Sequence, residues 1–116
     1  MSRKIIFIYL LLCNISFVLA QTSLIRTPNL SPDSNELAFS YQGDIWLYNL
    51  SSKISKRLTV HEAYESNPIW NNKGTKLAFA SNRKGSNNVF TVDKLGGMPM
   101  QVTYYPTGDT PYDWTN

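Results

Sequence analysis

His61 is the only imidazole in the chain, and a carboxylate, Glu62, follows it directly. Such a pair could transfer protons, because imidazole titrates near neutral pH. A hydrolase would also need a nucleophile, but no serine lies in a Gly-x-Ser-x-Gly or Ser-x-x-Lys motif. We therefore predict that this chain carries no catalytic residue, and we expect His61 to be structural, solvated or part of a ligand-facing loop.

The sequence does not indicate a metal or cofactor site either. One cysteine and one histidine cannot supply the roughly four ligands of a structural zinc site. Asp33 and Asp44 stand beside turn residues and lack the dense loop of oxygen ligands that calcium needs. Gly96-Gly97 precedes Met98-Pro99 rather than a helix, so we expect a hairpin turn and not a phosphate cradle. We predict no metal and no cofactor.

The charge balance argues against nucleic acid as a partner. Eleven Lys and Arg oppose eight Asp and Glu, which gives a formal net charge of +3, and two of the basic residues are Arg3 and Lys4. The others are scattered among acids, unlike the basic stripe of a nucleic-acid-binding face. Charged residues make up only 16% of the chain, which excludes a highly charged disordered protein.

The first twenty residues have the pattern of a secretory signal peptide. Arg3 and Lys4 form a basic start, residues 5–12 are an unbroken apolar run, and Val18-Leu19-Ala20 places small residues at the −3 and −1 positions. The apolar run is interrupted after residue 12 and is shorter than the roughly 20 residues of a membrane span. We predict cleavage after Ala20, a periplasmic or secreted protein, and membrane contact only during export.

The rest of the chain repeats itself. Leu37-Ala38-Phe39-Ser40 returns forty residues later as Leu77-Ala78-Phe79-Ala80, and Arg57-Leu58-Thr59 returns at an offset of forty-four as Gln101-Val102-Thr103. The offset grows because residues 41–44 are replaced by a longer, Gly- and Asn-rich segment at 81–88, which we expect to be a loop. Trp114 matches Trp70 and begins a third copy. A period of about 40–45 residues is typical of blade arrays.

Each period reads as four short strands. Apolar and polar residues alternate in the core strands, and Gly, Pro, Asn and Ser clusters separate them. The expected strands lie near Thr27–Ser31, Glu36–Tyr41, Asp44–Leu50, Ile54–Thr59, Asn67–Asn71, Lys76–Ser81, Asn88–Val92 and Met100–Thr103. We therefore predict an all-β fold of β-propeller blades, with blade 1 at about 24–60, blade 2 at about 61–104 and the start of blade 3 at about 105–116.

Aromatic residues recur at matching positions, and we expect most of them to fill the space between blades. The recurring set is Trp46, Trp70, Trp114, Phe39, Phe79, Phe90 and Tyr48. Two further segments, around 61–65 and 104–105, fall in matching loops between blades, and such loops gather at one rim of a propeller. We expect partner contacts there, from His61, Glu62, Tyr64, Glu65, Tyr104 and Tyr105.

These repeats resemble a known family. Leu30-Ser31-Pro32-Asp33, Leu37-Ala38-Phe39-Ser40 and Asp44-Ile45-Trp46 resemble the WD-like β-propeller repeat of TolB and the tricorn protease, and the next period matches likewise. The segment from Val102 to Trp114 looks most like secreted bacterial tricorn-type proteases, in which a propeller precedes a serine peptidase domain. The resemblance implies a non-catalytic scaffold or gate for peptides.

Two blades supply less apolar burial than a closed ring, because a repeat of this kind cannot cover its own sheet faces. The smallest ring of four blades needs roughly 160 residues. We therefore expect an N-terminal piece of a longer reading frame, namely the propeller of a secreted tricorn-like serine peptidase. Two alternatives stay open: a TolB-like periplasmic protein-binding propeller without enzymatic activity, and the propeller of an amidohydrolase-type hydrolase.

Overall fold

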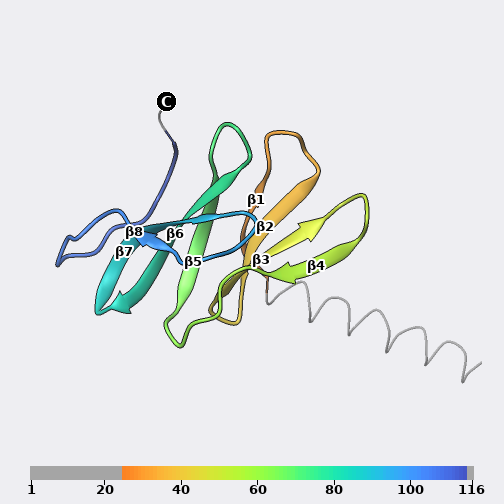
Figure 1. Ribbon diagram of the computed structural model, residues 1–116. Coiled ribbons are helices and arrows are strands. Elements are labelled where there is room, and N and C mark those ends of the chain that lie inside the picture. The colour runs from red at the N-terminus through yellow and green to blue at the C-terminus, as the bar shows by residue number, and fades with distance from the viewer. Residues whose placement is uncertain (1–24, 115–116) are drawn as a thin grey trace, which may run out of the picture.

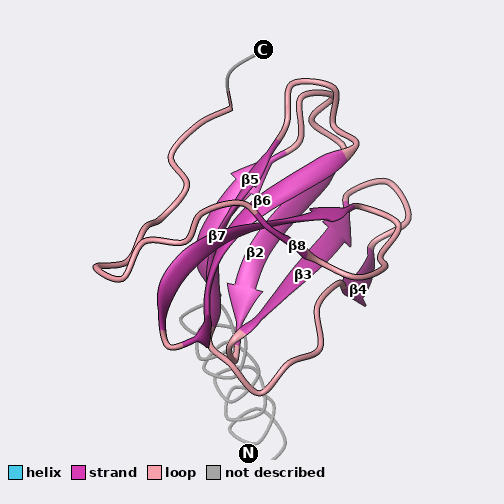
Figure 2. Cartoon of the chain, turned by 60° about the vertical axis from the view of Figure 1, so that its left-hand side comes forward, coloured by secondary structure: helices cyan, strands magenta, loops and turns pink. Residues whose placement is uncertain are grey.

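The computed structural model describes residues 25–114, which form two four-stranded antiparallel sheets without any helix among them (Figure 2). The signal peptide predicted at residues 1–20 lies outside the described residues. Residues 25–114 contain no helix that is long and apolar enough to cross a membrane. The all-β architecture is as predicted, and the two sheets stand side by side as successive blades (Figure 1).

In each sheet the strands follow one another in chain order, so every connection is a hairpin turn. Blade 1 contains β1 (Arg26–Leu30), β2 (Glu36–Tyr41), β3 (Asp44–Asn49) and β4 (Ile54–Arg57). Blade 2 contains β5 (Glu65–Trp70), β6 (Lys76–Lys84), β7 (Ser86–Asp93) and β8 (Met100–Gln101). The strand that begins blade 2 contacts β1, β2 and β3, so the two sheets converge on their β1 and β5 sides.

The segment at 81–88 is not the loop that its Gly and Asn content predicts. β6 and β7 continue through it and pair as far as Lys84 and Ser86, with Gly85 at the tip at φ +104°. A single glycine that accepts a positive φ is enough to close this turn, so the flanking residues are free to stay extended. The insertion therefore lengthens a hairpin.

The outer strands end earlier than expected, because a threonine side chain replaces the last ladder bond. In blade 1, Thr59 Oγ1 accepts a hydrogen bond from Ile45 N at 2.9 Å. In blade 2, Thr103 Oγ1 accepts from Val89 N at 2.8 Å in the same way. β4 thus stops at Arg57 and β8 at Gln101, and the chain turns away toward the next blade.

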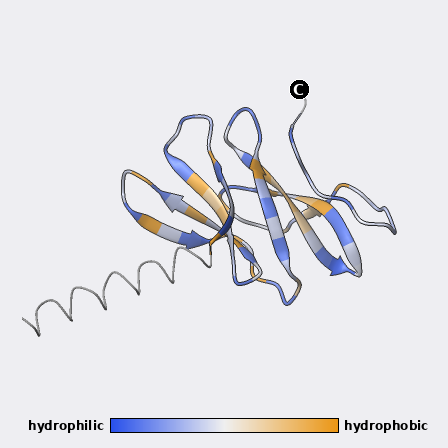
Figure 3. Cartoon of the chain, turned by 180° about the vertical axis from the view of Figure 1, so that it is seen from behind, coloured by the Kyte–Doolittle hydropathy of each residue, from blue (hydrophilic) through white to orange (hydrophobic). Residues whose placement is uncertain are grey.

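The core lies between the two sheets, where an aliphatic face of blade 1 meets a face of blade 2 that carries aromatic side chains. Blade 1 contributes the face that carries Ala38, and blade 2 contributes the face that carries two stacked phenylalanines, Phe79 and Phe90. The full buried cluster is Ala38, Ile45, Leu47, Leu58, Trp70, Leu77, Phe79, Phe90 and Val92. Hydrophobic stretches accordingly run along the strands of both sheets (Figure 3).

Because side chains alternate along a strand, the aromatic residues of blade 1 lie on the face opposite to the one that carries Ala38. Phe39 pairs with Trp46, and Leu37 with Tyr48, on the face turned away from blade 2. These positions correspond to Phe79, Phe90, Leu77 and Val92 of blade 2. The prediction of packing between blades is therefore confirmed for the blade 2 aromatics, whereas Trp46 and Tyr48 stay partly exposed and lie outside the buried cluster.

Tryptophans fasten each blade to the blade before it. Trp70 donates its indole N–H to the carbonyl oxygen of Asn29 in β1 at 3.1 Å, and its backbone N–H to the Asn29 side chain at 3.1 Å. Trp114 donates its indole N–H to the carbonyl of Ile69 in β5 at 3.0 Å. The predicted match between Trp70 and Trp114 is confirmed by these equivalent bonds.

A bulge with an unusual backbone recurs in the first strand of each blade. The register shifts between Arg26 and Asn29 in β1, and between Ser66 and Ile69 in β5. Inside these bulges Thr27 and Asn67 have φ of 49° and 54°. Asparagine tolerates this left-handed region, but a β-branched threonine is strained in it.

Candidate functional site

Hydrogen bonds place the two loops predicted to contact partners beside the β2–β3 and β6–β7 turns; the first loop lies at the lower side of Figure 1 and the loop after β8 at its left. Glu65 N donates to Gly43 O at 2.8 Å, and Tyr64 N donates to Asn82 Oδ1 at 2.8 Å. Ser86 Oγ donates to the carbonyl of Tyr105 at 3.1 Å. We name the surface formed by residues 60–64, 84–87 and 104–106 the loop rim.

Equivalent bonds hold the two rim loops. His61 N donates to Asp44 Oδ1 at 3.3 Å, and Tyr105 N donates to Asn88 Oδ1 at 2.8 Å. Asp44 is the first residue of β3, and Asn88 lies forty-four residues later near the start of β7. His61 and Tyr105 therefore occupy the same place in successive blades, and a side chain near the start of each third strand, Asp44 or Asn88, sets the path of the rim loop.

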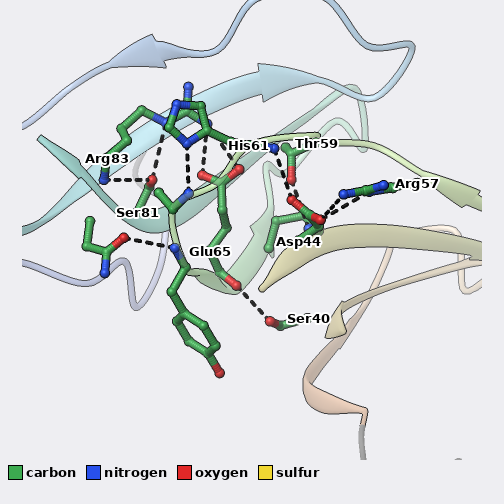
Figure 4. A network of polar contacts seen from close by, with 12 residues as sticks. Ser40, Asp44, Arg57, Thr59, His61, Glu65, Ser81 and Arg83 are labelled. Carbon is green, nitrogen blue, oxygen red and sulfur yellow. Dashed lines mark hydrogen bonds and ion pairs between the residues drawn. The ribbon is translucent and has the colours of Figure 1, made fainter. Parts of the chain in front are cut away.

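Asp44 also forms an ion pair that blade 2 lacks at the matching position. Arg57 donates to Asp44 Oδ2 through Nε at 3.0 Å and through Nη2 (Figure 4). In blade 2 the residue at the position of Arg57 is Gln101. Asp44 is buried, whereas the Arg57 side chain is 44% exposed. Asp44, which the sequence places beside turn residues, is thus a buried acceptor that links the outer strand β4 to the rim loop.

Glu65 is not part of the exposed rim, in contrast to the expectation from sequence. Its side chain is fully buried, and Arg83 Nη2 donates to both carboxylate oxygens at 3.0 and 2.9 Å. Arg83 is fixed in turn by an Nε bond to Ser81 Oγ at 3.2 Å, and its guanidinium lies 4.8 Å from the Phe90 ring centroid. Arg83 therefore neutralises the Glu65 carboxylate inside the protein, as a buried charge requires a partner (Figure 4).

Blade 1 holds the backbone of Glu65 as well. Ser40 Oγ donates to the carbonyl oxygen of Glu65 at 2.7 Å (Figure 4). Together with the Gly43 bond, this contact pins the start of β5 against the β2–β3 hairpin. The loop that carries the rim residues is therefore anchored at both of its ends, by Asp44 and by Glu65.

The remaining predicted contact residues do lie at the surface. His61 and Glu62 are exposed, and Tyr64, Tyr104 and Tyr105 are 47%, 73% and 60% exposed. The His61 ring accepts a hydrogen bond at Nδ1 from Ala63 N at 2.9 Å, so a local turn orients it. This contact gives the imidazole a structural role in the rim loop.

A hollow of about 340 Å³ opens beside the two neighbouring tyrosines of blade 2. It is lined by Lys84, Ser86, Asn88, Gln101, Tyr104, Tyr105 and Pro106. Sequence reasoning placed Tyr104 and Tyr105 here but missed Lys84. The signal that could have indicated Lys84 is the four-residue insertion relative to blade 1, whose Gly and Asn content predicts a loop.

A metal-binding cluster is not present in the described part of the chain, where no group of three or more His, Cys, Asp or Glu side chains could hold an ion. The two buried carboxylates that anchor the rim loop are instead paired with arginines, Asp44 with Arg57 and Glu65 with Arg83. What the rim offers is therefore a set of exposed aromatic and polar groups on firmly held loops.

Comparisons with known proteins agree with this fold. Solved structures of a putative TolB from Agrobacterium tumefaciens and of TolB from Acinetobacter baumannii superpose with TM-scores of 0.68 and 0.63, at 24% and 21% identity. They match 74% and 76% of this chain and 32% and 23% of their own chains. The tricorn protease structure has a TM-score of 0.62 at 18% identity, over 70% of this chain and 8% of its own.

A relative and a family model give the affiliation. An uncharacterized peptidase of Bacillus subtilis (strain 168), YuxL, is 26% identical over 102 residues, which is 78% of this chain and 16% of the relative. The chain thus spans less than a third of the length of each of these four proteins. The model of the tricorn protease N-terminal beta propeller domain matches residues 22–116. This chain therefore belongs to the tricorn protease N-terminal β-propeller family.

Proposed function

We propose that this chain is the N-terminal propeller segment of a secreted, tricorn-like serine peptidase, in which it serves as a non-catalytic scaffold or gate for peptides. The family match over residues 22–116 and the likeness to a peptidase of Bacillus subtilis support the assignment. Because the chain corresponds to only 16% of that peptidase, catalysis is assigned to other parts of the parent protein.

The observation that carries the proposed peptide contact is the arrangement of tyrosines on anchored loops. Tyr64, Tyr104 and Tyr105 are exposed side chains on a backbone that Asp44, Asn88 and Glu65 hold in place. Rigid aromatic side chains give up little conformational entropy when they bind, and tyrosine is enriched among residues that dominate interface energies. An extended peptide crossing the rim would meet several of them in succession.

Unfolded casein provides the test. We expect the purified chain to bind fluorescein-labelled casein and to leave it uncleaved, and we expect the double variant Tyr104→Ala/Tyr105→Ala to weaken binding. Leu95→Ala is the matched control, because Leu95 is 79% exposed on the β7–β8 turn at the opposite end of β7. Hydrolysis of casein by the purified chain, or equal binding by the tyrosine variant and the parent, contradicts the proposal.

Export is the second part of the proposal and has its own measurement. The leader pattern at residues 1–20 predicts that the exported protein begins at Gln21. Mass spectrometry of the periplasmic and secreted fractions should find this N-terminus. An intact Met1 together with retention inside the cell would contradict it.

A further inference from the structure

A comparison of the two blades distinguishes structural features from specialised ones, because the features that both blades share serve the fold. Thr59 and Thr103, Asp44 and Asn88, and Trp70 and Trp114 form equivalent bonds. Against this common pattern, blade 2 departs at the rim in two ways. Its β6–β7 hairpin is longer, and Tyr104-Tyr105 replaces Val60-His61 of blade 1.

Both departures line the same hollow. Lys84 and Ser86 come from the extended hairpin, and Tyr104 and Tyr105 come from the loop that follows β8. Blade 1 has no residue corresponding to Lys84, because its β2–β3 turn is closed by Gln42 and Gly43 alone. The hollow is therefore specific to blade 2 rather than a by-product of the repeat.

The hollow has one cation and no carboxylate among its lining residues. Three of its polar side chains are engaged internally: Ser86 Oγ with the Tyr105 carbonyl, Gln101 Nε2 with the Thr103 carbonyl at 2.9 Å, and Asn88 Oδ1 with Tyr105 N. The three ion pairs found within residues 25–114 do not include Lys84. Its ammonium is thus the uncompensated charge of the hollow.

The neighbouring arginine shows how the extended hairpin keeps this lysine in position. Arg83 is bound to Glu65 and Ser81 and lies over the Phe90 ring, so the hairpin is fixed immediately before its tip. Gly85 closes the turn directly after Lys84. The Lys84 backbone is therefore held within the hairpin, where Gly85 N donates to Asn82 O at 3.0 Å, and Lys84 lines the hollow together with the tyrosines.

We propose that this hollow binds a carboxylate of an extended peptide, with the Lys84 ammonium as the counter-charge and Tyr104 and Tyr105 as flanking aromatic walls. The proposal rests on the proposed peptide-contact function and deepens it, because it names acidic peptides as the preferred class. A glutamate side chain and a peptide C-terminus both supply a carboxylate, and the experiment separates the two sources.

Three fluorescein-labelled decapeptides of Gly, Ser and Ala serve as probes, and fluorescence anisotropy with the full chain measures their affinities. One has a central Glu and an amidated C-terminus, the second has Gln at that position and an amidated C-terminus, and the third is the Gln peptide with a free C-terminus. We expect the Glu peptide, the free C-terminus peptide, or both to bind about five-fold more tightly than the amidated Gln peptide. This ratio corresponds to about 1 kcal/mol, the upper range for a solvent-exposed ion pair.

Lys84→Met should reduce the preference to unity, and raising the salt from 50 mM to 500 mM should reduce it in the parent chain. Lys73→Met is the matched control, because Lys73 is an exposed lysine in the turn at the opposite end of β6. It should retain the preference. If Lys73→Met and Lys84→Met lower it equally, the effect is one of net charge and the hollow is not the site.

The outcomes also distinguish this proposal from the proposed function. If all three peptides bind equally and Tyr104→Ala/Tyr105→Ala weakens them, the rim contacts peptides without a preference for acids, and the carboxylate proposal is overturned. If none of the peptides and no casein binds, the peptide-contact function itself fails. Circular dichroism of each variant should match that of the parent, which links any loss to the hollow.

Discussion

Replacing Glu65 with glutamine should loosen blade 2 far more than an exposed ion-pair mutation would. The glutamine keeps the size of the side chain but removes the charge that Arg83 Nη2 contacts at 3.0 and 2.9 Å. Arg83 is only 13% exposed, so its guanidinium would lose its counter-charge in a largely dry environment. Breaking a buried pair in this way costs about 3–5 kcal/mol, and the lower value applies because Arg83 reaches some solvent.

Amide hydrogen exchange followed by mass spectrometry measures this cost without requiring the whole chain to unfold in one step. A loss of about 3 kcal/mol corresponds to roughly 100-fold faster exchange in β5 and β6, since each tenfold change is about 1.4 kcal/mol. The control is Asp44→Asn, whose carboxamide can still accept from His61 N as Asn88 accepts from Tyr105 N. Its partner Arg57 is 44% exposed, so at most about 1 kcal/mol should be lost.

A compensating double variant tests the cause. Glu65→Leu with Arg83→Met replaces the pair by apolar side chains, which is often neutral in a buried site. Exchange should then return to within a few-fold of the parent rate. Exchange in Glu65→Gln no faster than in Asp44→Asn would refute the reasoning that an uncompensated buried charge dominates. Exchange in the double variant that is as fast as in Glu65→Gln would also refute it, because the lost hydrogen bonds would then account for the effect.

Three further predictions concern single positions. Thr27→Asn should stabilise blade 1 by about 0.5–1 kcal/mol, because asparagine accepts the positive φ and Asn67 already fills the equivalent place; slower exchange in β1 checks this. Trp70→Phe should cost about 1 kcal/mol by leaving the β1 carbonyl without its indole donor, and unchanged exchange in β1 would contradict that. The hydroxyl bond from Ser31, and then the bond from the backbone N–H of residue 35, lower the pKa of Asp33 below its ordinary 3.8. Its ionised form therefore supports the β1–β2 turn above pH about 4 and loses that role as the pH falls through the lowered pKa, so an NMR titration should give a midpoint below 3.8.

The repeat made most of the fold predictable. Leu37-Ala38-Phe39-Ser40 and its copy at 77–80 alternate with period two, and such alternation fixes both the strand and the face that each side chain takes. Trp70 and Trp114 were matched from spacing alone, and they bond equivalently to the preceding blade. Local pattern and tertiary packing agree at these positions, so the sequence is informative there.

The candidate site was less predictable, because its bonds join residues that are distant in sequence. Nothing around Glu65 signals that Arg83, eighteen residues later, will neutralise it. The Gly and Asn content of the inserted segment at 81–88 predicts a loop, although one glycine at the tip is enough to close a hairpin there. Propensity describes local preference, and here the pairing of β6 with β7 outweighed it.

The two faces that meet between the blades differ, one aliphatic and the other carrying two phenylalanines, and this difference gives the stack of blades a direction. Blade 1 turns Ala38 and Leu47 toward blade 2, and blade 2 answers with Phe79 and Phe90. A reversed blade 2 would place Ala78 and Ala80 against Ala38 and leave empty the space that its phenylalanines now fill, whereas a blade added in the same orientation would fit its predecessor. Tandem duplication of a gene segment adds each new blade in the same orientation. The asymmetry that packs one sheet on the next therefore also allows such a chain to lengthen one blade at a time.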